Sequence, residues 1–219
     1  MIHALHGAVG MPEDWEGILP QAHAWNLWEM LSVDERSLAE AGEIIARGAA
    51  DGDSLIGYSM GGRIALHALL SGQCEWKEAV IISAHPGLAS GRKERLKADA
   101  TWADLALSDW AGFLEAWNSQ SVLSGPDSAW PDRFSLVSCQ EEISRSFRCW
   151  SLGTQDDLRP YLHRIECPVR WIVGEDDEKF LTLAREVVPL IPKGTLEVIP
   201  ATGHRVPWSL GFDLADLQA

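Results

Sequence analysis

The segment around Ser59 carries the residues best suited to chemistry in this 219-residue chain. Gly57 and Gly61 stand two positions before and after Ser59, between the end of a short apolar run and a helical pattern over residues 63–70. A strand that turns sharply into a helix leaves no room for side chains at those two glycine positions. A serine at the apex projects outward, and the N-terminus of the following helix favours negative charge that develops beside it. The segment therefore predicts a serine that acts as a nucleophile or in proton transfer.

Two other loops supply the side chains that such a serine needs. Asp177 follows the apolar run 169–173, and His204 follows the apolar run 195–199. A serine hydroxyl becomes reactive when a histidine takes its proton, and a carboxylate must hold that histidine in the right tautomer. In a parallel sheet such loops meet beyond the carboxyl ends of the strands. We therefore predict a catalytic triad of Ser59, Asp177 and His204, in the chain order typical of α/β-hydrolases.

Two members of this triad also have simpler interpretations. Asp177 could cap the helix predicted after it, and neighbouring Asp176 competes for the carboxylate role. The spacing of Asp177 from Gly174 favours Asp177 over its neighbour. His204 could be an ordinary loop residue, but its place directly after the last predicted strand favours catalysis. The histidines without such placement are interpreted as structural: His3, His23, His67, His85 and His163.

A negative charge on a reacting oxygen would need N–H donors close to Ser59. In α/β-hydrolases these donors are the backbone N–H of the residue after the serine and one N–H from a loop that follows an early strand. Met60 and Ala8 occupy those positions, and Ala8 comes directly after the pair His6-Gly7. We predict Met60 and Ala8 as the oxyanion hole. A plain strand-to-loop turn is the alternative interpretation for the segment at Ala8.

Alternating strands and helices must position these loops. Short β-branched or apolar runs predict strands, and helical apolar stripes predict the helices between them. The predicted strands are 2–6, 22–27, a run ending at residue 56, 79–84, 169–173 and 195–199, and the predicted helices are 14–19, 37–47, 63–70 and 181–190. This alternation predicts an α/β fold, with a compact, mostly parallel sheet and helices on both of its faces.

Strand signals disappear between residues 85 and 160, where helical spacing takes over. We predict that this segment is a helical cap, inserted between two parts of the core, residues 1–84 and residues 161–219. Its tryptophans could line a pocket or form a small core of the cap itself, and the second interpretation is favoured for any one of them. These tryptophans are Trp102, Trp110, Trp117, Trp130 and Trp150.

The charge balance restricts the partners of the protein. The formal net charge of −14 argues against nucleic acid and anionic membranes, which need clustered Lys and Arg. No apolar run approaches the ~20 residues that cross a bilayer, and no secretory signal is visible, so we expect a cytoplasmic protein. The four cysteines lack the spacing of a metal or redox site, so we expect reduced, structural thiols. The sequence leaves the oligomeric state open.

Several short motifs carry a more specific resemblance. They are Gly57-Tyr58-Ser59-Met60-Gly61-Gly62-Arg63, Ala84-His85-Pro86-Gly87-Leu88, Arg95-x-x-x-Asp99-x-x-Trp102-Ala103, Phe113-Leu114-x-x-Trp117, Gln155-Asp156-Asp157-Leu158 and Gly174-Glu175-x-Asp177-x-Lys179-Phe180. In this order the motifs resemble the 2-succinyl-6-hydroxy-2,4-cyclohexadiene-1-carboxylate synthases of menaquinone biosynthesis. The resemblance extends over residues 4–205 and includes the cap, which is the part that varies most among hydrolase relatives.

The resemblance implies an elimination and not a hydrolysis. Serine and histidine would remove a proton from a cyclohexene carboxylate, and pyruvate would leave as the ring becomes a conjugated diene. It implies neither a metal nor an organic cofactor. By the match of motifs, the anionic substrate would be bound by Tyr58, Arg63, Arg95 and Trp117. A further arginine that the family has late in the cap has no counterpart in register here, and Arg133 and Arg145 are the nearest candidates.

Other functions stay open from the sequence. A carboxylesterase or thioesterase would use the same triad, with Ser59 forming an acyl-enzyme from a small ester. A neutral ester has no need of Arg63 and Arg95, which in that case would make surface or structural salt bridges. The chain could also be a non-catalytic binding protein that keeps a relic of the triad.

Overall fold

The computed structural model describes residues 1–32, 34–123, 132–209, 212, 214 and 217. Within these residues six strands form one sheet in the order β2-β1-β3-β4-β5-β6, and every neighbouring pair is parallel. The strands are β1 Ile2–Leu5, β2 His23–Trp25, β3 Ser54–Tyr58, β4 Glu78–Ile82, β5 Val169–Gly174 and β6 Gly194–Ile199. All six predicted strands are therefore present, and the prediction of a mostly parallel sheet is confirmed.

The two faces of the sheet are covered by different kinds of element. One face packs on three α-helices: α1 Leu38–Gly48, α2 Met60–Leu70 and α6 Glu178–Val187. The other face packs on the 3-10 helices η1 Pro12–Trp15 and η7 Val206–Trp208 and on residues near the C-terminus. Because the central strands are buried on both faces, their sequences are continuous apolar runs, as expected for a parallel sheet. The predicted helix at 14–19 is wrong in type and extent, since a 3-10 helix of four residues stands there.

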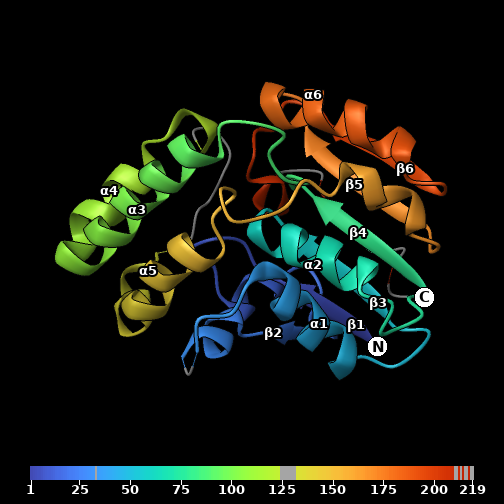
Figure 1. The fold of residues 1–219 in the computed structure, drawn as a ribbon, viewed down its shortest axis with the longest axis horizontal. Coiled ribbons are helices and arrows are strands. Elements are labelled where there is room, and N and C mark those ends of the chain that lie inside the picture. Colours follow the sequence, from blue (N-terminus) through green and yellow to red (C-terminus); the bar gives the residue numbers. More distant parts are fainter. Residues whose placement is uncertain (33, 124–131, 210–211, 213, 215–216, 218–219) are drawn as a thin grey trace.

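The cap helices lie between β4 and β5 in the chain. They are α3 Arg92–Ser108, α4 Trp110–Asn118 and α5 Gln140–Cys149, and Figure 1 shows them grouped to one side of the sheet. Aromatic rings hold the helices together: Phe113 of α4 meets Trp102 of α3 edge-on at 6.1 Å and Phe147 of α5 edge-on at 5.8 Å. Such pairs of rings stabilise packing beyond their buried area. Trp130 lies outside the described residues, and the division at residues 85 and 160 stays a prediction.

Short 3-10 helices complete the connections between the main elements. They are η2 Leu27–Leu31, η3 Ser121–Leu123, η4 Phe134–Cys139, η5 Arg159–Arg164 and η6 Val188–Leu190. A capping box begins α1, where the Ser37 hydroxyl accepts from the Glu40 N–H and the Glu40 carboxylate accepts from the Ser37 N–H. Among the described residues, no helix has both the length and the apolar character needed to cross a membrane.

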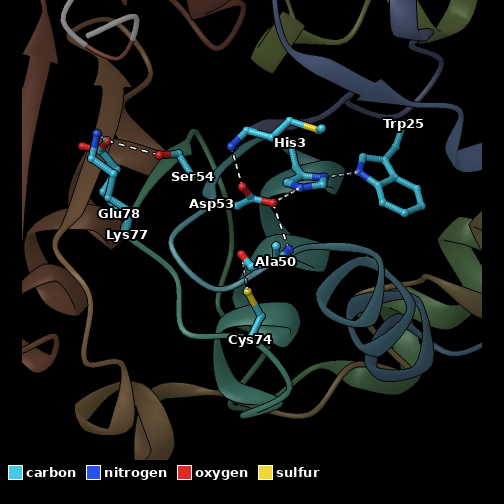
Figure 2. Close-up of polar contacts among 9 residues, drawn as sticks. His3, Trp25, Ala50, Asp53, Ser54, Cys74, Lys77 and Glu78 are labelled. Carbon is cyan, nitrogen blue, oxygen red and sulfur yellow. Dashed lines mark hydrogen bonds and ion pairs between the residues drawn. The ribbon is translucent and has the colours of Figure 1, made fainter.

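A polar cluster joins three strands at the end of the sheet opposite Ser59. Figure 2 shows Asp53 accepting hydrogen bonds from the Met1 amino group, from the Ala50 N–H at 2.9 Å and from His3 Nε2 at 2.9 Å. His3 Nδ1 accepts from Trp25 Nε1 at 3.0 Å, so the proton of this imidazole lies on Nε2. The Met1 amino group, followed by these hydrogen bonds, holds the pKa of Asp53 below its usual range. The cluster therefore ties the start of β1 and the last residue of β2 to Asp53, the residue directly before β3.

Candidate active site

Ser59 sits on a strained turn between β3 and α2. Its φ of 52° lies in the left-handed region, which is costly for a residue with a side chain. The two flanking glycines are required by close approach of backbone. A Cβ on Gly61 would lie 2.3 Å from the Leu5 carbonyl oxygen, and a Cβ on Gly57 would lie 2.5 Å from the Gly61 carbonyl oxygen. The spacing of these glycines in the sequence thus has the steric reason that we predicted.

Ser59, His204 and Asp177 form a continuous hydrogen-bonded chain. Ser59 Oγ lies 3.1 Å from His204 Nε2, and His204 Nδ1 lies 2.6 Å from Asp177 Oδ2. His204 and Asp177 are buried, whereas Ser59 is partly exposed. Asp177 stands at the N-cap position of α6, but its side chain makes no capping bond and turns to His204 instead. Asp176 is exposed, so the geometry favours Asp177 for the carboxylate role.

Close contact between the loops after β5 and β6 brings Asp177 and His204 together. A Cβ on Gly174 would lie 2.1 Å from the Thr202 carbonyl oxygen, so only glycine fits there. The Asp176 N–H donates to that same Thr202 oxygen at 2.9 Å. The Glu175 carboxylate accepts from the Ala201 N–H at 3.1 Å. These contacts hold the two loops together independently of the bond between Asp177 and His204, which are 27 residues apart in the chain.

A cavity opens over Ser59 between these loops and the cap. Ala8 and Met60 line it beside Ser59, and Met60 is the first residue of α2, where N–H groups have no partner within the helix. A turn closed by the Gly10 N–H on the Gly7 carbonyl at 3.1 Å shapes the segment that holds Ala8. The arrangement suits two N–H groups that converge on an oxygen at Ser59. The roles of Ala8 and Met60 as oxyanion donors stay predictions.

Among the described residues, three cationic side chains line the same cavity: Arg63, Arg95 and Lys179. Arg63 is buried, and its Nε donates to Gln155 Oε1 at 2.6 Å. Its Nη2 is buried without a hydrogen-bond partner among the described residues. Burial, followed by the charge of Arg95, lowers the pKa of Arg63 to about 9, so the guanidinium still carries its charge at pH 7. An anion in the cavity would supply the missing partner.

The other two cations differ in how far the protein neutralises them. Arg95 Nε donates to Asp99 Oδ2 at 2.7 Å, and that oxygen also accepts from the Ser151 hydroxyl at 2.7 Å. Lys179 has no carboxylate partner among the described residues, and burial lowers its pKa. The cavity therefore has an excess of positive charge within a strongly acidic protein.

Trp117 and Phe180 give the cavity apolar walls. Trp117 packs edge-on against Phe147 at 5.2 Å, so it belongs both to the cavity lining and to the core of the cap. Phe180 lies 4.4 Å from the His204 ring, centroid to centroid. A flat, partly apolar ligand with several negative charges would match these walls together with the three cations.

Tyr58 differs in position from the other predicted binding residues. It is not among the described residues that line the cavity, because its ring is buried beneath Gly7 and between His204 at 5.7 Å and Trp208 at 5.4 Å. Burial raises the pKa of its hydroxyl. Binding of substrate by Tyr58 stays a prediction, and in this structure Tyr58 supports the ring of His204.

The two late-cap arginines also stand outside the described cavity lining. Arg133 pairs with Asp14 at 2.5 Å, and Arg145 donates to the Leu31 carbonyl. Lys179 and Phe180 are among the lining residues that were not predicted as part of the site. Gln155, which was not predicted either, binds Arg63 but is not among the described lining residues. His85, interpreted as structural, also lines the cavity, where its Nδ1 accepts from the Gly87 N–H at 3.1 Å and burial lowers its pKa to about 3. All four residues belong to motifs of the resemblance, which was the available signal.

The described residues contain no group of three or more His, Cys, Asp or Glu side chains placed to hold a metal ion. All four cysteines have free thiols. Burial raises the pKa of the Cys167 thiol to about 11, which keeps it in the unreactive protonated form at neutral pH. The groups present at the cavity are a serine, a histidine and a carboxylate joined by hydrogen bonds, with cationic side chains around them.

Comparisons with known proteins identify the family of the chain. The profile of the alpha/beta hydrolase family matches residues 5–216. A 2-succinyl-6-hydroxy-2,4-cyclohexadiene-1-carboxylate synthase from Pectobacterium atrosepticum is 31% identical, over 85% of this chain and 82% of that protein. A Bacillus subtilis relative is 32% identical over 69% of this chain, and that match spans only 59% of the relative's own length.

Among solved structures, MenH from S. aureus superposes with a TM-score of 0.81 at 22% sequence identity, covering 95% of this chain and 87% of that one. The similarity in structure therefore includes the cap as well as the sheet. The family match covers nearly all of the sheet, the triad residues and the cavity lining. The chain belongs to the alpha/beta hydrolase family of enzymes and is a relative of the 2-succinyl-6-hydroxy-2,4-cyclohexadiene-1-carboxylate synthases.

Proposed function

We propose that this enzyme eliminates pyruvate from a cyclohexene carboxylate to give 2-succinyl-6-hydroxy-2,4-cyclohexadiene-1-carboxylate. The relative from Pectobacterium atrosepticum carries the name of that activity. The observation that carries the proposal is the cationic cavity over Ser59, in which the buried Arg63 Nη2 has no hydrogen-bond partner in the part of the chain that the structure describes. A protein with a net charge of −14 repels a multiple carboxylate unless arginine and lysine are concentrated where it binds.

In this mechanism Ser59 and His204 act together as a base. The Ser59 oxygen takes a proton from a ring carbon as its own proton passes to His204 Nε2, across the 3.1 Å contact. The electron pair of the broken C–H bond becomes a new ring double bond, and the C–O bond breaks with its electron pair on the leaving oxygen. The enolate of pyruvate that leaves takes up the proton held by His204 Nε2, which restores the base. Asp177 holds the histidine in the tautomer that accepts at Nε2 and stabilises the imidazolium that forms.

The oxyanion donors stabilise the charge that builds up during proton removal. The N–H groups of Ala8 and Met60 face a substrate oxygen that becomes negative as the ring proton leaves. In enzymes where one such donor was removed, the loss was about 3 kcal/mol of transition-state stabilisation. Arg63, Arg95 and Lys179 hold the carboxylates and so orient the ring carbon toward Ser59.

Hydrolysis of a small ester is the second candidate function. It is favoured by the same Ser59–His204 contact, because a serine so activated can attack a carbonyl carbon and form an acyl-enzyme. The partly exposed Ser59 argues against a sealed relic of a triad in a binding protein.

Replacing Arg63 separates elimination from hydrolysis. We expect Arg63→Met to lower kcat/KM for the cyclohexene carboxylate by about 100-fold, because a charge-assisted contact with a carboxylate is lost. Turnover of a neutral p-nitrophenyl ester should change less than threefold, since no carboxylate is bound. The exposed Arg47, which pairs with Glu43 on α1, offers the control variant Arg47→Met. Equal losses on both substrates would contradict an anion site at Arg63.

A further inference from the structure

Arg133 and Asp14 form an ion pair that joins the cap to the core. Arg133 directly precedes η4 in the cap, and Asp14 lies in η1, 119 residues earlier in the chain. Arg133 Nη2 donates to Asp14 Oδ1 at 2.5 Å, and the two side chains are only 1% and 5% exposed. Water and salt screen so deeply buried a pair only weakly. Burial raises the pKa of Asp14, and the charge and hydrogen bond of Arg133 act against that rise.

Asp14 also holds the segment that carries the Ala8 N–H. Its other oxygen, Oδ2, accepts from the Met11 N–H at 3.0 Å. Met11 lies within residues 7–14, which we name the 7–14 loop and which include the first residues of η1. The same oxygen lies against Gly10, where an added Cβ would stand 2.9 Å from it. One carboxylate thus contacts the cap through Oδ1 and the backbone of the 7–14 loop through Oδ2.

The 7–14 loop needs such support because its backbone is strained. Val9, directly after Ala8, has a φ of 56°, which is a left-handed conformation for a β-branched residue. Strain of this kind persists only where the surrounding contacts impose it. The Trp28 indole N–H donates to the Gly10 carbonyl at 2.8 Å and restrains the loop from the core side. Asp14 supplies the restraint on the side that faces the cap.

We propose that Arg133 and Asp14 are a positioning pair, through which the cap fixes the 7–14 loop and so aims the Ala8 N–H at the oxygen that gains negative charge. The inference rests on the proposed role of Ala8 in catalysis. Arg133 is not among the described cavity-lining residues, so it acts through Asp14 and not on the substrate. A shift of the 7–14 loop would weaken transition-state stabilisation without weakening substrate binding.

Two variants test this inference. Asp14→Asn keeps the shape of the side chain and an oxygen for the Met11 N–H but removes the charge that holds Arg133. Arg133→Met keeps the volume and removes the charge at the other end. We expect each to lower kcat about tenfold with KM changed less than twofold. The rate at which a fluorophosphonate reagent labels Ser59 should fall by a similar factor, because phosphonylation also needs the oxyanion donors. Arg133→Lys should recover most of both losses.

Controls separate positioning from general destabilisation. Arg148→Met removes a cap arginine whose partner is Asp104, and those side chains are 47% and 72% exposed. It should leave kcat, KM and labelling unchanged. Thermal unfolding followed by circular dichroism fixes a temperature at which all variants are folded. If Arg133→Met does not fold, Asp14→Asn decides the question, since it is isosteric.

The outcomes distinguish this inference from the proposed function. Unchanged kcat and labelling in folded Asp14→Asn would overturn the positioning role and leave the elimination intact. A raised KM with normal kcat in Arg133→Met would also overturn it, because that result means direct contact with substrate. If the cyclohexene carboxylate is not turned over at all, the ester kinetics and the labelling rates still test the pair, and only the proposed function fails.

Discussion

At the scale of single residues, Ser59 combines a hydroxyl placed for reaction with a strained backbone conformation. Its φ of 52° lifts the hydroxyl out of the end of β3 and toward His204. Left-handed backbone at a residue with a Cβ costs of order 1–3 kcal/mol, which the rest of the fold must offset. Exposing the hydroxyl to a substrate thus lowers the stability of the protein, a trade-off common at active sites.

Two substitutions of Ser59 should separate this strain from the chemistry. Both Ser59→Ala and Ser59→Gly remove the hydroxyl, so both should abolish turnover. Ser59→Gly should unfold with a free energy about 1 kcal/mol higher than Ser59→Ala, because glycine adopts a positive φ without a steric cost. Urea denaturation measures the difference. Retained turnover in either variant would refute the triad, and a more stable alanine variant would refute the strain.

The meeting of the three side chains of the predicted triad could be expected from the sequence, whereas most of their surroundings could not. Ser59, Asp177 and His204 each follow a recognisable strand, so their meeting is a consequence of parallel topology. Gln155 follows no strand, and it reaches Arg63 from the end of the cap, 92 residues away. Tyr58 was predicted to bind substrate but is covered by the 7–14 loop. This is possible because Gly7 has no side chain that would collide with the Tyr58 ring. Such contacts depend on packing that no local pattern records.

At the scale of elements, β1 leads into the 7–14 loop through a histidine that must stay neutral. His6 Nδ1 donates to the Gly7 carbonyl at 2.9 Å, and His6 Nε2 accepts from the Leu27 N–H at 3.2 Å. A second proton on the ring would remove the acceptor that Leu27 needs. Burial lowers the pKa of His6 to about 4, against 6.5 for an unperturbed histidine.

Stability should therefore fall as the solution is acidified. Between pH 6.5 and pH 4, His6 binds a proton in the unfolded chain but not in the folded chain. The free energy of unfolding therefore decreases as pH falls, by roughly 3 kcal/mol for this histidine. His67 and His85, with pKa values lowered by burial to about 4 and about 3, act in the same direction.

The contribution of His6 can be measured by substitution. Urea unfolding between pH 7.5 and pH 4.5 should give a shallower acid slope for His6→Gln than for the wild type. The exposed His163 provides the control variant His163→Gln, which should keep the full slope. An unchanged slope in His6→Gln would mean that this ring is not held neutral by the fold.

The elements of the core were easier to predict than those of the cap. Core strands stand out as apolar runs because both faces of the sheet are covered. In the cap, α3 has few buried residues, among them Asp99, Ala103 and Ala106, and its sequence shows no apolar stripe that specifies its neighbours. Its packing depends on contacts such as the Ser144 hydroxyl with the Ala103 carbonyl at 2.9 Å, between α5 and α3. The cap was therefore predictable as helical, but its arrangement was not.

At the scale of the whole molecule, charge is distributed unevenly. The protein carries a net charge of −14, yet Arg63, Arg95 and Lys179 converge on one cavity beside Ser59. A local concentration of positive charge lets a site attract anions although the net negative charge of the protein repels them. The cap contributes Arg95, and the helices α2 and α6 of the core contribute Arg63 and Lys179, so the proposed anion site lies where the cap and the core meet.

The most direct measurement of the proposed activity is release of pyruvate by the purified protein. The cyclohexene carboxylate and a set of short p-nitrophenyl esters are supplied separately, and kcat/KM is compared. The cationic cavity and the Ser59–His204–Asp177 chain predict rapid pyruvate release and ester cleavage at least a hundredfold less efficient. Efficient ester cleavage without pyruvate release would contradict elimination and establish Ser59 as a nucleophile toward acyl groups.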